Sequence, residues 1–489
     1  MGMQKYIGFI LVVLSFTSCK KWLDVKPVSQ VSEEDLFKTE SGFEEALNGI
    51  YTRCTQRDLY GFELSFGFPE VLAQNYTFPT DDFQRYQQTA GYNYKDPLFV
   101  VRKDTAWIGL YHAIVNCNLL LENLEKHQDV LTGDQYALIK AEALALRAYL
   151  HFDVLRLFAP SFKSNAGAKA IPYVTSFSNK VTALSTVTEV LTNIIQDLKQ
   201  AKELIRPVDP ILTAGYVVGY PTDDNPPEEA SRSLFLQNRR HRMNYYAICG
   251  TLARACLYMD KKDEALSNAM EVINSNKFPW TASADFIEPD PEKKDRIFYK
   301  ELVFGWYIPK MKDTLSSRFA GAKGLYIEEN AGKALYETGG TGGDDIRFKQ
   351  WFNLVSGSFT FNHLELQKYL RDNDKNRHYL MAPAIRLSEM YYIASECSYD
   401  LSPAVALAYL NTVRFYRGMG VPLAVTSKEE LLTELVKETR KETYAEGQIF
   451  YMYKRLNRGI TGQLGGIVSP SDKVFVLPLP DNEILFGNR

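Results

Sequence analysis

The sequence has few of the residues that build metal centres and disulfide frameworks. Only six histidines and six cysteines occur among 489 residues, and neither a CxxC pair nor an HExxH motif is present. These absences argue against a zinc site built on CxxC pairs, against a zinc site built on an HExxH helix, and against a disulfide scaffold. Five cysteines follow residue 19 at irregular spacing, and we expect them to be mostly buried free thiols. They are Cys54, Cys117, Cys249, Cys256 and Cys397.

Charge and hydropathy exclude further classes. The net charge is −3 and no basic stripe occurs, so nothing indicates a nucleic acid or an anionic membrane surface as a partner. The apolar run from Ile7 to Phe16 is too short to span a bilayer, which needs roughly 20 residues.

The N-terminus has the layout of an export signal. Lys5 precedes the apolar run, and the small residues Thr17 and Ser18 lead directly to Cys19. The pattern resembles a bacterial lipobox, in which residues 1–18 are removed and acyl chains are attached to Cys19. Acyl chains anchor a protein through buried CH₂ groups. The alternative is an ordinary signal peptide followed by an incidental cysteine.

Apolar residues at three- and four-residue spacing predict a stack of helical hairpins. Hairpins of about 34 residues are the tetratricopeptide unit, and three pairs fit it loosely: 134–158 with 187–205, 242–259 with 263–274, and 386–399 with 404–417. Further helices are expected at 32–51, 107–124 and 429–457. Short extended runs are expected at 301–308 and 474–477.

Two irregular blocks, 58–99 and 286–362, concentrate the aromatic residues of a chain with 30 Tyr and 28 Phe. They are too aromatic for disorder, and long irregular segments are commonly functional. Aromatic faces beside polar side chains suit the C–H faces and hydroxyls of sugars. Any one ring can instead belong to the core. The predicted ligand residues are Tyr76, Asp82, Arg85, Tyr86, Tyr92 and Tyr94 from the first block, and Trp306, Tyr307 and Tyr326 from the second.

Three other loops have less specific patterns. Residues 207–230 are rich in Pro and Asp, and we expect a solvated insertion. The GGTGG run at 339–343 lacks the Lys-Ser/Thr of a phosphate-binding loop and predicts a flexible segment. The acid pairs Asp81–Asp82 and Asp344–Asp345 could hold a structural calcium ion through oxygen ligands. Adjacent loop acids are more often simply solvated, and no cofactor or metal is predicted.

Seven short motifs follow one another in order along the chain. They span nearly the whole chain. They are Ser18-Cys19 with Trp22-Leu23-Asp24 and Pro27; Ala145–Tyr149 with Phe152, Leu157-Phe158 and Ile171-Pro172; Leu252–Ala255 with Leu257-Tyr258; Arg386–Tyr391 with Ala394 and Glu396; Leu410-Asn411 with Val413-Arg414; Glu446-Gly447 with Lys454-Arg455; and Val476 with Pro478, Pro480 and Glu483-Ile484.

These motifs resemble those of the SusD/RagB family of outer-membrane lipoproteins of Bacteroidetes. The resemblance implies an all-α fold with about four tetratricopeptide-like pairs carrying an irregular region with a few short strands. It divides the body, residues 19–489, into an N-terminal SusD-like part, 19–285, and a C-terminal RagB/SusD part, 286–489. It implies a lipid-anchored, non-catalytic protein on the outer membrane, facing the cell surface. Such a protein captures oligosaccharide and delivers it to a SusC-like TonB-dependent transporter. Three alternatives remain: a peptide-capturing RagB-like protein, a periplasmic helical-repeat scaffold and a secreted glycosidase.

Overall fold

The computed structural model describes residues 33–78, 82–320, 324–356, 362–371, 376–463 and 465–487. The predicted signal peptide, Cys19 and Asp81 lie outside these ranges.

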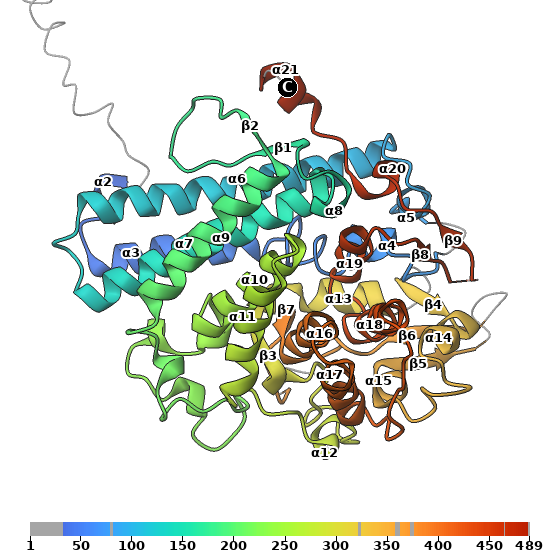
Figure 1. Cartoon of the computed structure of the whole chain (residues 1–489). Helices are drawn as coiled ribbons and strands as arrows, with labels where there is room; N and C mark the ends of the chain where they lie inside the picture. The colour runs from blue at the N-terminus through green and yellow to red at the C-terminus, as the bar shows by residue number, and fades with distance from the viewer. Residues whose placement is uncertain are drawn as a thin grey trace, which may run out of the picture.

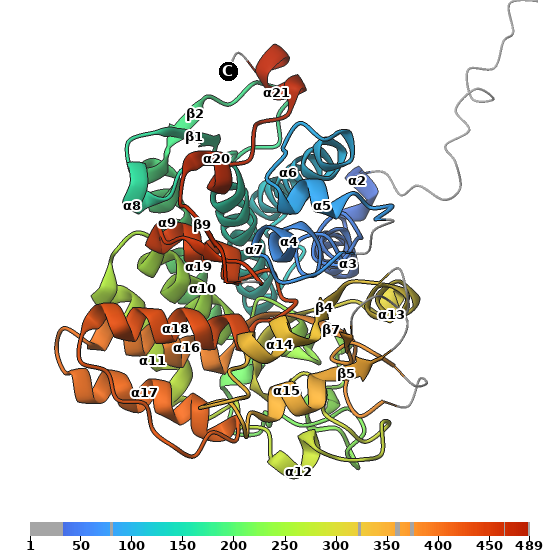
Figure 2. The ribbon, with the colours of Figure 1, turned by 90° about the vertical axis from the view of Figure 1, so that its right-hand side faces the viewer.

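The body of the protein is a stack of helices in which successive helices pack on one another (Figures 1 and 2). Contacts run from α3 through α6, α7, α9, α10 and α11 to α16, which packs on both α17 and α18. The bounds are α3 Glu40–Cys54, α6 Pro97–Lys126, α7 Gly133–Phe158, α9 Val187–Ile205, α10 Tyr245–Tyr258, α11 Lys262–Asn274, α16 Leu387–Ser398, α17 Pro403–Tyr416 and α18 Lys428–Glu442. The predicted all-α class and its three hairpin pairs are confirmed.

Local sequence explains where the two central helices begin. Thr132 and Gln135 form a reciprocal capping box at the start of α7, and Thr186 and Glu189 form another at the start of α9. Such boxes satisfy backbone N–H groups that have no partner inside the helix. Pro160 and Pro207 follow the two helices and prevent their continuation.

A loop-rich region with short strands lies beside the helical stack. In Figure 2 its short helices α13, α14 and α15 lie to the right of α16 and α17. β3 (Leu302–Tyr307) pairs antiparallel with β7 (Met381–Arg386). A three-stranded antiparallel sheet has the order β4-β6-β5, from Tyr326–Glu328, His363–Leu366 and Phe352–Val355. Two small hairpins complete the strands: β1 (Lys169–Pro172) with β2 (Leu184–Thr186), and β8 (Ile460–Thr461) with β9 (Ile467–Val468).

The remaining helices are short. They are α2 Glu33–Leu36, α4 Phe68–Leu72, α5 Tyr86–Ala90, α8 Phe162–Asn165, α12 Ser283–Phe286, α13 Lys312–Phe319, α14 Glu329–Leu335, α15 Ile346–Trp351, α19 Ile449–Leu456, α20 Asp472–Phe475 and α21 Asp481–Phe486.

Four boundaries differ from the sequence prediction. The predicted helix 32–51 is broken into α2 and α3, which ends at Cys54. Helix α6 begins at Pro97, ten residues before the predicted start at 107, because Asp96 accepts hydrogen bonds from the N–H groups of Leu98 and Phe99. The predicted helix 429–457 is broken into α18 and α19. The predicted extended run 474–477 begins inside the short helix α20.

Two loops expected to be solvated are built partly into the core: residues 222–225 and Asp344 are exposed, as predicted, but other residues of these loops are buried. In segment 207–230, Tyr216, Tyr220 and Glu228 are buried, and Tyr216 donates a hydrogen bond to Glu228. Asp345 is fully buried and pairs with Arg347 at 2.7 Å. Its carboxylate therefore belongs to an internal ion-pair network rather than to a solvated acid pair.

Two observations bear on the cysteines and on membrane insertion. Cys54, Cys117, Cys249, Cys256 and Cys397 are all buried and free, as the irregular spacing predicted. Within the described residues, every helix falls short of the length or the apolar character that crossing a bilayer requires.

Candidate functional site

Two hollows meet at Tyr307, the last residue of β3, and together form what we call the Tyr307 groove. One has a volume of about 390 Å³ and is walled mainly by Tyr307, Arg371, His378 and Tyr379. The other has a volume of about 320 Å³ and lies between the C-terminal half of α3, the 234–242 segment and β3. Its walls include Asn48, Tyr51, Thr52, Thr55, Gln237, Asn238, His241, Arg242 and Trp306.

The ring of Tyr307 is held by other rings yet stays accessible. It stacks on the imidazole of His241, with centroids 5.1 Å apart and planes 16° from parallel. Tyr379 meets it edge-on at 5.3 Å. Tyr307 is nevertheless 40% exposed. An aromatic ring that is fixed on one side and open to solvent offers an apolar platform to a ligand.

Three buried polar atoms beside this platform have no hydrogen-bond partner among the described residues. They are Nε1 of Trp306, Nε2 of His241 and Nη2 of Arg242, and all three residues line the second hollow. An unsatisfied buried polar atom costs about 1–3 kcal/mol, so such atoms are rare unless water or a ligand bonds them. The groove therefore presents unused hydrogen-bonding capacity next to an open ring face.

Burial fixes the protonation of one of these groups. Burial, together with the charges of Arg240 and Arg242, lowers the pKa of His241 to about 3. The imidazole is therefore neutral at physiological pH, and its Nε2 can accept or donate a hydrogen bond according to its tautomer.

A buried ion-pair network holds the wall of the groove in place. Glu142 of α7 is fully buried and accepts hydrogen bonds from Tyr51 at 2.7 Å, Arg239 at 2.7 Å and Arg242 at 3.0 Å. Burial opposes the ionised form of Glu142, but Arg242 and Arg239 outweigh it and lower its pKa. Because Asn48 also accepts from Arg242 at 2.7 Å, α3, α7 and the 239–242 segment are joined at one point.

The structure separates the nine predicted ligand residues. Tyr307 lies in the groove and is 40% exposed, whereas Trp306 lines the groove but is only 1% exposed. Tyr76, Tyr86, Tyr94 and Tyr326 are buried, and the hydroxyl of Tyr76 donates to the carbonyl of Phe66.

The other three predicted residues have local roles near α5. Asp82 accepts a hydrogen bond from the N–H of Gln87, and Arg85 pairs with Asp96 at 2.7 Å. Tyr92 is partly buried and donates to the carbonyl of Leu72.

Sequence reasoning missed His241, Arg242 and Tyr379. His241 and Tyr379 lie outside the predicted helices, and Arg242 is the first residue of one. Only the cationic run Arg239–Arg242 could have drawn attention to the first two.

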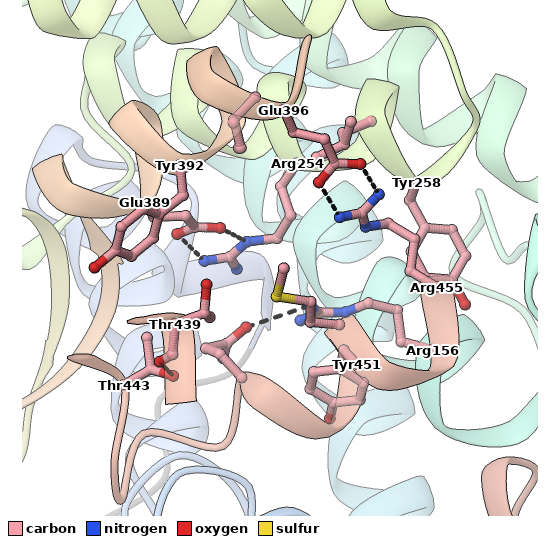
Figure 3. Close-up of a pocket in the computed structure, with 14 residues that line it drawn as sticks. Arg156, Arg254, Tyr258, Glu389, Tyr392, Glu396, Thr439, Thr443, Tyr451 and Arg455 are labelled. Carbon is pink, nitrogen blue, oxygen red and sulfur yellow. Dashed lines mark hydrogen bonds and ion pairs between the residues drawn. The ribbon is translucent and has the colours of Figure 1, made fainter. Parts of the chain in front are cut away.

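A third cavity, of about 90 Å³, lies inside the helical stack (Figure 3). Arg254 pairs with Glu389 at 2.6 Å, and Arg455 pairs with Glu396 at 2.6 Å. These four residues belong to the motifs identified in the sequence, and they come from α10, α16 and α19. The guanidinium group of Arg156 lies 3.9 Å from the ring of Tyr451. We interpret this cavity as the charged interior of the scaffold.

The Tyr307 groove differs from a hydrolytic site in its lining. None of the described residues that wall its two hollows is Asp or Glu, whereas glycoside hydrolysis usually needs two carboxylates. In the described part of the chain, no three His, Cys, Asp or Glu side chains gather closely enough to hold a metal ion.

This chain is similar in sequence and in fold to known proteins. Residues 21–210 match the model of a SusD-like family described as "starch-binding associating with outer membrane". A SusD-like protein of Formosa agariphila is 22% identical over 472 residues, which cover 85% of this chain and 82% of that protein.

Solved structures share the fold. A SusD superfamily protein of Bacteroides thetaiotaomicron is 21% identical, with a TM-score of 0.71 over 92% of this chain and 98% of that one. A SusD-like carbohydrate binding protein of Bacteroides vulgatus is 18% identical, with a TM-score of 0.70 over 92% of this chain and 97% of that one. The family match over residues 21–210, the similarity along most of the chain and the shared fold all agree with the SusD/RagB resemblance seen in the sequence.

Proposed function

We propose that this protein binds an oligosaccharide in the Tyr307 groove and delivers it to a SusC-like TonB-dependent transporter without chemically changing it. The observation that carries the proposal is the open ring of Tyr307 beside three buried polar atoms without partners. A pyranose ring can place its C–H face on the tyrosine ring, and its hydroxyls can bond Trp306 Nε1, Arg242 Nη2 and His241 Nε2 when the side chains that cover these buried atoms shift. The description of the matching family as starch-binding supports a sugar ligand.

The absence of Asp and Glu from the described lining of the groove favours capture over hydrolysis. A peptide is the second candidate ligand, because Asn48, Gln237 and Asn238 could also bond a peptide backbone. The open aromatic platform favours a sugar, because the C–H face of a pyranose packs on a ring face, whereas a peptide backbone is recognised mainly through its amide hydrogen bonds.

The proposal includes attachment to the outer membrane through acyl chains on Cys19, with the binding body at the cell surface. The family description, associating with outer membrane, supports this location. Protease treatment of intact cells tests the orientation: degradation is expected, and protection would instead support a periplasmic scaffold.

Binding is tested by measuring the retention of the purified body, without its signal peptide, on a panel of glycans and on a peptide mixture. We expect retention on at least one glycan and no release of reducing ends. Tyr307→Ala should abolish the retention. The control Phe415→Ala removes an equally apolar, 66% exposed ring from α17 and should leave it unchanged. Retention on peptides alone would overturn the sugar proposal.

A further inference from the structure

A separate hollow of about 440 Å³ lies between the end of α3 and the start of α6. Its walls are Arg53, Gln56, Arg57, Asp58, Glu63, Val101, Arg102 and Thr105. We call it the arginine hollow. None of the nine ligand residues predicted from the sequence lies in its wall.

Positive charge exceeds negative charge around this hollow. Arg53 is neutralised by Asp58, with Nη1 and Oδ1 2.9 Å apart. Arg102 approaches Glu63 only at 3.4 Å. The guanidinium groups of Arg57 and of the neighbouring Arg318 both lie 5.9 Å from the ring centroid of Phe62. Four guanidinium groups therefore surround two carboxylates.

Arg102 has unused hydrogen-bonding capacity in this wall. Its side chain is 10% exposed, and its guanidinium group lies 4.3 Å from the ring centroid of Tyr86. Nη2 donates to the carbonyl of Gln84 at 2.7 Å, whereas Nη1 has no hydrogen-bond partner among the described residues. Burial and the nearby charges of Arg57 and Arg102 lower the pKa of Arg318, as expected where like charges crowd together.

The arginine hollow adjoins the Tyr307 groove at the end of α3. Thr52 and Thr55 line the groove, and Gln56 lines the hollow. The side chain of Gln56 donates to the carbonyl of Thr52 at 2.8 Å, so one turn of helix separates the two surfaces. A ligand several sugar residues long could therefore contact both.

We propose that the arginine hollow binds a carboxylate or sulfate ester on the captured glycan, so that the oligosaccharide taken by this protein is acidic. Guanidinium groups bind such oxyanions with charge-assisted, often bidentate hydrogen bonds, which are stronger than those to neutral hydroxyls. An anion here supplies the missing negative charge and an acceptor for Nη1 of Arg102. This inference rests on the proposed function, because the glycan bound in the groove carries the anion.

The test compares glycans that differ only in charge. Equilibrium affinity is measured for oligogalacturonate and its methyl ester, and for a sulfated galactan oligosaccharide and its desulfated product. We expect the charged member of at least one pair to bind roughly tenfold more tightly, about 1.4 kcal/mol, because hydrogen bonds to a charged group are stronger than those to a neutral hydroxyl. The preference should weaken at high salt, because the hollow is open to solvent.

Variants assign the effect to the hollow. Arg57→Gln removes an exposed guanidinium, and Arg102→Lys keeps the charge but loses the planar fork. Both should reduce the preference for the charged glycan and leave affinity for the neutral member of the pair unchanged. The control Lys126→Gln removes an exposed charge from the other end of α6, about 36 Å away along the helix axis, and should have no effect.

Two results would overturn this inference while leaving the proposed function intact: equal affinity within every pair, or a preference that Arg57→Gln and Arg102→Lys do not change. Failure to bind any glycan, neutral or charged, would overturn the proposed function itself. Thermal unfolding of each variant establishes that a loss of preference does not come from unfolding.

Discussion

A Cβ atom added to Gly447 would lie 2.1 Å from the carbonyl oxygen of Leu64. Gly447 also has a φ of +71°, a conformation that costs other residues energy. Its N–H donates to the buried carboxylate of Glu70 at 2.7 Å, which holds the turn between α18 and α19 against α4. The close approach to Leu64 and the positive φ thus explain why glycine follows Glu446 in this motif.

Gly447→Ala should therefore lower the free energy of unfolding by roughly 3 kcal/mol, from backbone strain and overpacking together. Urea denaturation measures the change. Gly49→Ala is the control, because Gly49 lies inside helix α3 with no atom within 4 Å of its added Cβ. It should raise stability by up to about 1 kcal/mol. A Gly447→Ala protein as stable as the wild type would contradict the packing described here.

Replacing Glu142 should destabilise the wall of the Tyr307 groove. Glu142→Gln leaves Arg239 and Arg242 buried without their shared carboxylate, and breaking a buried ion pair costs roughly 3–5 kcal/mol. Chemical denaturation should show this loss. In comparison, Glu125→Gln removes an exposed partner of Lys140 and should cost no more than about 1 kcal/mol. If Glu142→Gln lost as little stability as Glu125→Gln, the buried network would not support the fold.

The buried acids of α18 predict a loss of stability in acid. Burial opposes the ionised form of Glu438, but Arg347, Lys441 and Arg414 outweigh it and lower its pKa to about 2, from 4.5. Because the folded-state pKa is depressed, the stabilisation is complete above pH 4.5 and is lost as the pH falls toward 2. Its size is roughly 3 kcal/mol. Urea midpoints across this range should fall, and Glu438→Gln should make the fall shallower.

The five cysteines should be unreactive in the folded protein. Burial raises the pKa of Cys117, Cys249 and Cys397 to about 12 and that of Cys256 to about 11, and it raises the pKa of Cys54 further. The thiols therefore stay protonated and inaccessible at neutral pH. A thiol reagent should label the body beginning at residue 20 slowly in buffer and at all five positions in urea. Rapid labelling in buffer would contradict their burial.

The sequence predicted the helices better than the site, for physical reasons. The one-sided apolar stripe and capping residues of Val187–Ile205 act locally, so both ends of α9 were predicted correctly. Burial of a tyrosine depends on distant parts of the chain. Tyr86 has polar neighbours in the sequence and Tyr307 has apolar ones, yet Tyr86 is 1% exposed and Tyr307 is 40% exposed.

The groove also depends on residues far apart in sequence. Asn48, His241 and Trp306 come from three separate segments, and no local pattern in the sequence joins them. The seven motifs, by contrast, indicated the family to which the similar sequences and structures belong. Among their residues, Arg254, Glu389, Glu396 and Arg455 form ion pairs inside the scaffold.

The most direct test of the central claim is the NMR signal of the Trp306 indole N–H during titration with the glycan selected on the panel. The signal is assigned by its disappearance in Trp306→Phe, which keeps an aromatic ring but removes the donor. We predict a saturable shift of this signal, while the indole N–H of Trp351, which donates to the carbonyl of Arg296 at 2.8 Å, stays in place. Glycan binding that leaves the Trp306 signal unmoved would contradict the account.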